Sequence, residues 1–479
     1  MQIDDVGRGA APARSAPTPA VRLDAPIFPR LPHPRRLPVI EDLLSIRVGR
    51  PAQSLTRLAT DLGPLFEVQS LGIRYVVAAG SEVIRELNDD SRFAKHLGPE
   101  IEALRVLGGD GLFTARTGEP NWIAAHELLM PAFSQSAMRS YHDDMLDVTS
   151  ELIARWDAAA GKRTVNVPSD TTRATLETVV RCSAGYTFDL FGSKNTHAHV
   201  RHMVAALKRA GLLGIVRASA LPSFIARPVE RSLRRHSAHW AKVADEIVAA
   251  RWATVAVEHA PVREDLLQLM LESDLDIANI RYQLINFLIA GHETTSGAMS
   301  FALYHLGREP EMFARARAEI DEVWGDTDRP SFENVAKLRY VRRVFDEALR
   351  LHPPVPGYYR MAREDTVLAG VHPMQKGEWA LALTSALHQD PQWGPCPERF
   401  DPDRFEPQRV RERPPGLYKP FGTGERSCIG RQFALHEAVL MLASIIRRYE
   451  LIVDPRYRLT VLERPTLLPK RFRLGLRRR

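Results

Sequence analysis

The sequence of 479 residues contains little cysteine. Its only cysteines are Cys182, Cys396 and Cys428. Three scattered thiols are too few for a disulfide framework, which favours a reducing compartment and predicts a cytoplasmic protein. Cys428 has no second cysteine or histidine at the spacing of a zinc site. If this thiol has a function, it acts without a partner thiol.

The sequence also lacks an uninterrupted apolar run long enough to span a bilayer. The longest candidate, residues 284–306, is broken at its centre by the polar residues 292–296. Residues 1–37 are rich in Pro, Ala and Arg and contain no apolar stretch of the kind that a secretory signal needs. We therefore expect no transmembrane anchor, and a flexible arm at the N-terminus.

No boundary divides the remaining sequence. From about residue 38 to the C-terminus, apolar segments at helical spacing follow one another without a Ser/Gly-rich or charge-rich linker. With 44% hydrophobic and 26% charged residues, the composition is that of a globular protein with ample core material. The prediction is one large, mainly helical domain over residues 38–479.

The net charge of +7 is compatible with nucleic acid, a membrane surface or an acidic protein as a partner. Nucleic acid is the least favoured, because no binding motif is present and the basic residues are not grouped with aromatic ones on one element. We expect no nucleic-acid partner.

Cys428 lies in a glycine-containing loop directly before a predicted helix. Residues 421–431 read FGTGERSCIGR, and residues 432–446 carry apolar positions at helical spacing. The free N–H groups and the dipole of a helix start favour a thiolate over a thiol. Gly430 would let the helix approach a flat ring closely, and Arg426 is placed to reach an anionic group. On this loop alone, an ordinary buried cysteine remains the alternative.

The apolar segment from about Ile277 to Leu306 is predicted to be a long helix. Its central polar cluster, residues 290–295, is costly to bury unless it is partnered or functional. Ser296 stands where a zinc protease motif H-E-x-x-H needs its second histidine, which excludes that motif. A polar stripe that merely reaches solvent is the alternative.

Two side-chain pairs are placed one helical turn apart. Glu347 and Arg350 are spaced for an ion pair, and Trp122 and His126 share one face of a predicted helix. Pairs of this kind occur on many exposed helices and carry little weight by themselves.

The spacing F-G-x-G-x-R-x-C-x-G over residues 421–430 resembles the haem-binding signature of the cytochrome P450 family. Residues 290–294, A-G-x-E-T, resemble the oxygen-binding pattern of the same family. The resemblance implies the cytochrome P450 fold, a large helical domain with a smaller β-containing part. It also implies haem b as cofactor, with Cys428 as the axial thiolate.

The resemblance assigns further roles around the haem. Phe421 would shield the sulfur, Gly430 would face the ring, and Ala290 and Gly291 would leave room over the iron. Glu293 and Thr294 would relay the protons that oxygen activation consumes. The residues that would contact the propionates are Arg426, Trp122 and His126. Arg399, in a P-E-R-F motif, would join Glu347 and Arg350 in a buried charge network behind the cysteine loop.

A closer resemblance covers most of residues 38–479. Residues 109–114, 287–297 and 432–438 are similar to the haem domains of bacterial self-sufficient fatty-acid hydroxylases. This similarity implies that Phe113 stands over the distal haem face and that Lys95 helps to bind a propionate. It further implies a substrate pocket lined by Val355, Gly357 and Tyr358.

Two departures limit this comparison. The sequence ends roughly fifty residues beyond Cys428, where those hydroxylases continue into a flavin reductase, so electrons are expected from a separate ferredoxin or flavodoxin with its reductase. Residues 70–75 lack the arginine that anchors a fatty-acid carboxylate, for which Arg74 and Tyr75 are candidate substitutes. The apolar residues 212–225 are expected to form part of an access channel, with a membrane-touching loop as the weaker option.

We therefore predict a monomeric monooxygenase that inserts one oxygen atom from O2 into a lipophilic small molecule by hydroxylation or epoxidation. A secondary-metabolite scaffold is favoured slightly over a fatty-acyl compound. A peroxide-driven haem-thiolate enzyme and a non-catalytic haem-binding or gas-sensing protein are the alternatives. Neither would need the proton relay of Glu293 and Thr294.

Overall fold

The computed structural model describes residues 28–36, 41–42, 44–47, 49–192, 197–219, 221–256, 263–463 and 466–479. Most of the predicted N-terminal arm, residues 1–37, lies outside these ranges, and the domain boundary at residue 38 stays a prediction. The α-helices are α1 (Pro51–Leu62), α2 (Ser81–Leu87), α3 (Gly98–Gly108), α4 (Pro120–Leu129), α5 (Met138–Asp157), α6 (Val167–Ala184), α7 (His197–Ala218), α8 (Ala226–Val255), α9 (Leu266–Leu271), α10 (Ile277–Leu306), α11 (Pro310–Trp324), α12 (Phe332–Ala336), α13 (Arg339–Leu351), α14 (Thr384–Leu387), α15 (Pro407–Glu412) and α16 (Arg431–Arg448).

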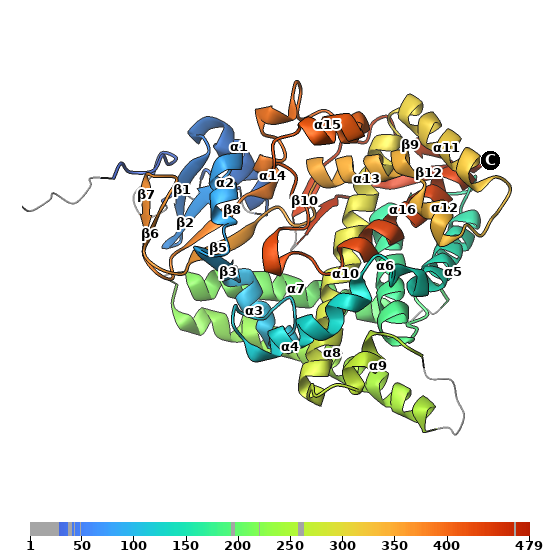
Figure 1. Cartoon of the computed structure of the whole chain (residues 1–479), viewed down its shortest axis with the longest axis horizontal. Coiled ribbons are helices and arrows are strands. Elements are labelled where there is room, and N and C mark those ends of the chain that lie inside the picture. Colours follow the sequence, from blue (N-terminus) through green and yellow to red (C-terminus); the bar gives the residue numbers. More distant parts are fainter. Residues whose placement is uncertain are drawn as a thin grey trace, which may run out of the picture.

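The strands are β1 (Leu65–Ser70), β2 (Ile73–Ala78), β3 (Phe93–His96), β4 (Val165–Asn166), β5 (Tyr358–Ala362), β6 (Thr366–Leu368), β7 (His372–Met374), β8 (Trp379–Ala382), β9 (Tyr449–Val453), β10 (Val461–Glu463), β11 (Leu467–Pro469) and β12 (Arg473–Arg478). The largest sheet has the order β1-β2-β8-β5-β3, in which only β2 and β8 run parallel. Helices predominate, which confirms the predicted mainly α fold with a smaller β-containing part. Figure 1 shows the large sheet at one end of the molecule, with α1 and α2 beside it.

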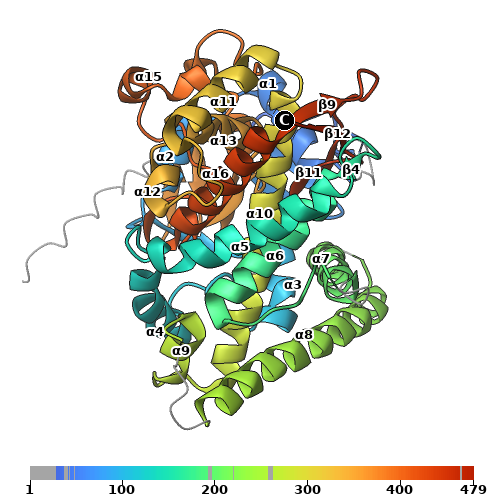
Figure 2. The ribbon, with the colours of Figure 1, turned by 90° about the vertical axis from the view of Figure 1, so that its right-hand side faces the viewer.

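Helix α10 runs through the middle of the helical part, with α7 and α8 on its outer side (Figure 2). The helix begins where the Asp276 side chain accepts a hydrogen bond from the Asn279 N–H at 2.7 Å, as an N-cap does. Its residues between 280 and 289 belong to one buried core, and those between 298 and 306 to another. The break between the two cores therefore falls on the polar stretch that the sequence singles out.

The two faces of the large sheet pack against different helices, because side chains alternate along each strand. On the face that we call the α1 face, Phe66, Val77 and Leu381 pack with Leu55 of α1. On the α2 face, Leu65, Val76 and Ala380 pack with Ile84 and Leu87 of α2. A residue's position in a strand thus decides which face of the sheet its side chain lies on.

None of the helices in the described ranges combines the length and the apolar character that a bilayer-spanning segment requires. Helices α8 and α10 are each 30 residues long, and buried polar residues such as His292 and Glu293 occupy the centre of α10.

Candidate active site

The cysteine loop turns back on itself before α16. Gly422 and Gly424 have φ angles of +70° and +69°, which residues with a Cβ rarely adopt. The turn lets the Cys428 N–H donate to the Phe421 carbonyl at 2.9 Å. Gly430 is the N-cap residue of α16, and a Cβ there would lie 4.0 Å from the Cys428 sulfur. The loop therefore holds the thiol at the helix start, as predicted.

The Cys428 side chain is exposed, yet burial is the largest influence on its pKa. Both observations hold if the thiol faces a space that the protein encloses. Burial raises the pKa of the thiol, and this outweighs the opposing effects of the Gly430 N–H and the Arg431 charge. The helix start and the Arg431 charge thus favour the thiolate, as expected, but burial has the larger influence on this thiol.

Helix α10 presents a short accessible surface in the middle of its buried length. Ala290 is exposed although its neighbours Leu288 and Ile289 are buried. One turn later, the Thr294 hydroxyl donates to the Ala290 carbonyl at 2.8 Å, which places both residues on one side of the helix. Ala290 and Thr294 therefore face the same open space.

Gly291 and Glu293 point elsewhere. A Cβ on Gly291 would collide with Val179 of α6, so this position needs glycine for helix packing, and its role in leaving room over the iron stays a prediction. Glu293 is buried, and its Oε2 atom accepts a hydrogen bond from the Thr466 hydroxyl at 2.9 Å. In this conformation the carboxylate is turned toward the segment before β11.

The predicted propionate contacts form a cluster of cations. Trp122 and His126 on α4 stack with ring centroids 4.7 Å apart, and the Arg426 guanidinium lies 4.2 Å from the Trp122 ring. The Lys95 ammonium donates to the Phe113 carbonyl at 2.7 Å. Burial, followed by the charges of Arg426 and Arg105, holds the pKa of Lys95 well below its usual value. Burial lowers the pKa of Arg426 to about 10.

Within the described part of the chain, neither Lys95 nor Arg426 forms an ion pair. A half-buried group of mutually repelling cations fits an anionic ligand. Together with the enclosed thiol of Cys428 and the open surface at Ala290, this donor set fits haem, whose iron takes a thiolate and whose propionates take cations.

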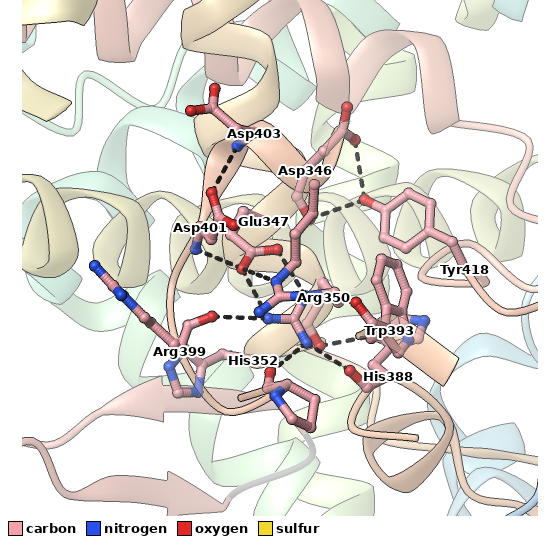
Figure 3. Close-up of polar contacts among 12 residues, drawn as sticks. Asp346, Glu347, Arg350, His352, His388, Trp393, Arg399, Asp401, Asp403 and Tyr418 are labelled. Carbon is pink, nitrogen blue, oxygen red and sulfur yellow. Dashed lines mark hydrogen bonds and ion pairs between the residues drawn. The ribbon is translucent and has the colours of Figure 1, made fainter. Parts of the chain in front are cut away.

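The charge network behind the cysteine loop is shown in Figure 3. Arg350 donates from Nε and from one terminal nitrogen to the Glu347 carboxylate at 2.6 and 2.7 Å. Its remaining donors reach the backbone carbonyls of His388 (2.7 Å), Pro397 (2.7 Å) and Arg399 (3.1 Å). All five guanidinium N–H groups are therefore used, in a site with no exposure. This confirms the predicted Glu347–Arg350 pair.

Arg404 is the third charged member of this network. Its Nε atom lies 3.8 Å from Glu347 Oε1, and its other nitrogens donate to the carbonyls of Trp393, Pro395 and Cys396 at 2.6, 3.0 and 2.9 Å. Arg399 is exposed and contributes only its backbone carbonyl. The prediction of Arg399 is therefore wrong, since the second of two similar motifs, P-D-R-F, supplies the buried side chain.

His388 links this network to the cysteine loop. The Lys419 N–H donates to His388 Nε2 at 2.9 Å, so Nδ1 must carry the proton that it shares with the Arg350 carbonyl at 3.1 Å. Burial, followed by the Arg350 charge, lowers the pKa of His388 to about 3, which keeps the ring neutral. A further link is Tyr418, whose hydroxyl contacts Asp346 of α13 at 2.9 Å.

Sequence reasoning missed the residue that positions the Phe113 loop. Asn286 of α10 accepts hydrogen bonds from the N–H groups of Phe113 and Thr114 at 3.0 and 3.1 Å, and it donates to the Gly108 carbonyl at 2.9 Å. Gln283, one turn earlier, accepts from the Leu112 N–H at 2.9 Å. Two amides three residues apart on an apolar helix are the signal that marks this function in the sequence.

The predicted pocket residues after α13 fall into two groups. Val355 is exposed, consistent with a pocket or surface position. A Cβ on Gly357 would lie 2.8 Å from the Ala382 carbonyl, so this glycine serves the close approach of β8. The Tyr358 hydroxyl donates to Asn88 at 2.9 Å and its ring packs against the core of the α2 face. The pocket role of Tyr358 stays a prediction that these contacts do not support.

Arg74, one candidate for a carboxylate anchor, already pairs with an acid. Its Nε atom donates to Glu67 at 2.7 Å, and the alternation of β2 sets Arg74 and Tyr75 on opposite faces of the sheet. Arg74 is thus paired with Glu67. Of these two residues, it is Tyr75 that lies on the α1 face.

Comparisons with known proteins agree with this geometry. The family model described as cytochrome P450 matches residues 31–474. The chain is 38% identical over 458 residues to a bifunctional cytochrome P450/NADPH–P450 reductase of Bacillus subtilis, covering 94% of this chain and 42% of that protein. It is 34% identical over 461 residues to a self-sufficient cytochrome P450 monooxygenase of Penicillium freii, covering 93% of this chain and 42% of that protein. A solved cytochrome P450, CYP102L1, superposes with a TM-score of 0.87 at 36% identity, covering 95% of this chain and all of that one.

Proposed function

The chain belongs to the cytochrome P450 family, whose members are monooxygenases that bind haem b through a cysteine thiolate, and on that premise we propose that Cys428 is the iron ligand and that the Ala290–Thr294 surface faces the oxygen side. The observation that carries this proposal is the accessible surface at the centre of the buried helix α10, together with the accessible Cys428 thiol at the start of α16. When bound, the haem supplies the iron centre that activates O2, with electron density pushed from the thiolate.

Thr294 is proposed to handle protons on the oxygen side. At rest its hydroxyl proton is held by the Ala290 carbonyl at 2.8 Å, which leaves the oxygen lone pairs free to accept from a water molecule. A rotation of the hydroxyl then presents the proton to the open space. The Glu293 carboxylate accepts a hydrogen bond from the Thr466 hydroxyl, so it must turn away from Thr466 before it can donate a new proton to Thr294.

The cation cluster is proposed to orient the cofactor. Arg426 and Lys95 would neutralise the propionates, His126 would donate a hydrogen bond to one of them, and the Trp122 ring holds Arg426 in place through its face. Burial, the main cause, lowers the pKa values of Lys95 and Arg426, and a bound anion would oppose this because a negative charge favours their protonated forms. Phe421 and Gly430 complete the proposed contacts on the sulfur side.

The substrate class and the electron donor are also proposed. The chain spans about two fifths of the length of the curated relatives it matches. We propose a lipophilic substrate that is hydroxylated or epoxidised, either a secondary-metabolite scaffold or a fatty-acyl compound. The positive balance of the sequence supports an acidic ferredoxin or flavodoxin as a separate electron donor. The monomeric state and the cytoplasmic location stay predictions.

The decisive experiment is the spectrum of the reduced protein with carbon monoxide. The wild-type protein should show the red-shifted Soret band of thiolate ligation, and Cys428→Ser should lose it. Cys396→Ser, which removes an exposed thiol elsewhere, is the matched control and should keep the band. A Cys428→Ser protein with an unchanged band would refute the ligand assignment.

Thr294→Ala tests the oxygen side. We expect NAD(P)H consumption to uncouple from product formation by roughly 10-fold or more, since the loss of a positioned proton donor costs 10²–10⁴ in general acid catalysis. Thr294→Ser keeps the hydroxyl and should stay coupled. Unchanged coupling in Thr294→Ala would refute the proposed proton relay. Turnover with peroxide alone would favour the peroxide-driven alternative.

A further inference from the structure

Four aromatic rings meet on the α1 face of the large sheet. Trp379 of β8 lies at the centre, with ring centroids 5.4 Å from Tyr75 of β2, 5.4 Å from His96 of β3 and 5.2 Å from Tyr359 of β5. All four residues are half-buried. Because aromatic faces carry partial negative charge, such a group attracts cations.

A carboxylate completes this cluster. Glu100, in the first turn of α3, has its Oε2 atom 3.4 Å from the Tyr359 hydroxyl. Burial raises the pKa of Glu100. The Glu100 charge in turn adds to burial in raising the pKa of Tyr75 and of Tyr359. The acid therefore sits among phenols and rings rather than beside a cation.

The nearby cations are engaged with other acids. Arg74 pairs with Glu67 on the opposite face of the sheet, and Arg116 pairs with Glu102 on α3. In the ranges that the structure describes, no lysine, arginine or histidine forms an ion pair with Glu100. An acid at the start of a helix gains from the helix dipole, which explains why it is tolerated but not why aromatic rings surround it.

The cluster lies where the sheet, α3 and α7 meet. Gly98, with a φ of +68°, gives the Tyr359 ring room against the start of α3. A Cβ on Gly214 of α7 would collide with the Pro99 carbonyl, so α7 crosses directly over that start. Leu212 and Ile215, beside Gly214 in the sequence, are 47% and 38% exposed. Figure 1 shows α3 beside β3 and α7. The helix that crosses the start of α3 therefore also carries exposed apolar side chains.

We propose that Glu100 and the rings of Tyr75, Tyr359 and Trp379 bind the cationic nitrogen of a lipophilic amine. This inference rests on the proposed monooxygenase function and names the substrate class of that site. A cation would supply the charge partner that Glu100 lacks among the described residues, and the rings would stabilise it further. A fatty-acid carboxylate at this position would be repelled by Glu100 instead.

The test compares three probes that share a dodecyl chain and differ in the head group. The haem-loaded protein is titrated with dodecyltrimethylammonium, 1-dodecanol and dodecanoate, each below its micelle concentration, and the spin-state shift of the Soret band reports binding. The trimethylammonium nitrogen has no lone pair, so its shift cannot arise from coordination to iron. We expect the ammonium to bind about 10-fold tighter than the alcohol, and the carboxylate to bind most weakly.

Glu100→Gln removes the charge while keeping the size of the side chain. The ammonium affinity should fall about 10-fold, to that of the alcohol, while the alcohol affinity stays unchanged. Glu102→Gln, two residues along the same helix with its carboxylate paired to Arg116, is the matched control and should leave the ranking as in the wild type. If Glu100→Gln does not fold, the ranking of the three probes on the wild-type protein decides.

Equal affinities for the three probes, or tighter binding of dodecanoate, would overturn the cation site. If the red-shifted carbon monoxide band and oxidation of 1-dodecanol persist in that case, the monooxygenase proposal stands. Absence of that band from the wild-type protein would instead refute the proposed function itself. The two failures are therefore distinguishable.

Discussion

Replacing Arg404 with alanine removes the side chain that joins the Glu347–Arg350 pair to the segment before the cysteine loop. The Arg404 side chain is only 7% exposed, and it donates three hydrogen bonds to the carbonyls of Trp393, Pro395 and Cys396. It also provides a second positive charge 3.8 Å from Glu347. Breaking a buried charge contact by removing one partner costs about 3–5 kcal/mol. We expect a loss of that size in the free energy of unfolding.

Arg399→Ala is the matched comparison, because the two arginines lie five residues apart in similar motifs. The Arg399 side chain is exposed and only its backbone carbonyl, which alanine retains, contacts Arg350. A surface substitution of this kind changes stability by about 0.5 kcal/mol or less. The structure thus predicts a difference of several kcal/mol between two chemically identical substitutions.

The assay is urea unfolding followed by circular dichroism, with the reduced carbon monoxide spectrum recorded on the same samples. Arg404→Ala should unfold at a lower urea concentration with an unchanged slope, and a fraction of its Soret intensity should leave the thiolate-ligated position. Arg404→Lys keeps the charge but not the planar fork, and should fall between the wild type and Arg404→Ala. Equal losses in Arg404→Ala and Arg399→Ala would refute the assignment of the buried member.

Three further predictions concern residues outside that network. Asn286→Ala removes the amide that holds the Phe113 loop, so the unfolding free energy should fall by about 1–3 kcal/mol. Product analysis should also show a changed ratio of oxidation products. An unchanged ratio would mean that other contacts hold the loop. Gly291→Ala should lose about 1–3 kcal/mol through collision with Val179, and Val179→Ala should recover part of it, whereas additive losses in this double-mutant cycle would contradict the packing role. Burial raises the pKa of Glu437 to about 8 from 4.5, so its protonated form contributes stability at low pH that is lost as pH rises through 8. In parallel urea titrations, Glu437→Gln should therefore gain about 2–4 kcal/mol in the free energy of unfolding at pH 8 and little at pH 4. A gain that does not depend on pH would show that the buried acid is not its cause.

Features that depend on local pattern were predictable from the sequence. The bounds of α10 follow from the Asp276 cap and the apolar periodicity, and the structure places the helix at Ile277–Leu306 as predicted. The cysteine loop is equally local, because its turn needs the glycines at 422 and 424 and its helix follows at once. The pairing of Trp122 with His126 follows from their spacing of four residues.

Features that depend on how distant segments meet were not predictable in the same way. The segment CPERFDPDRF contains two arginines in similar settings, and only its register on α13 selects Arg404 over Arg399. Glu100 and its rings come from α3 and three separate strands, so no sequence window contains them. The contact of Gly291 with Val179 likewise joins two helices that lie more than a hundred residues apart in the sequence.

The fully hydrogen-bonded guanidinium of Arg350 also bears on how the protein binds its cofactor. Three of its acceptors are backbone carbonyls between residues 388 and 399, and none of its partners is a residue proposed to touch the haem. This frame can therefore close before any cofactor arrives, and it already tethers the Cys428 loop through His388 and the Lys419 N–H. We therefore expect the position of the Cys428 loop to depend on this frame as well as on the bond between sulfur and iron.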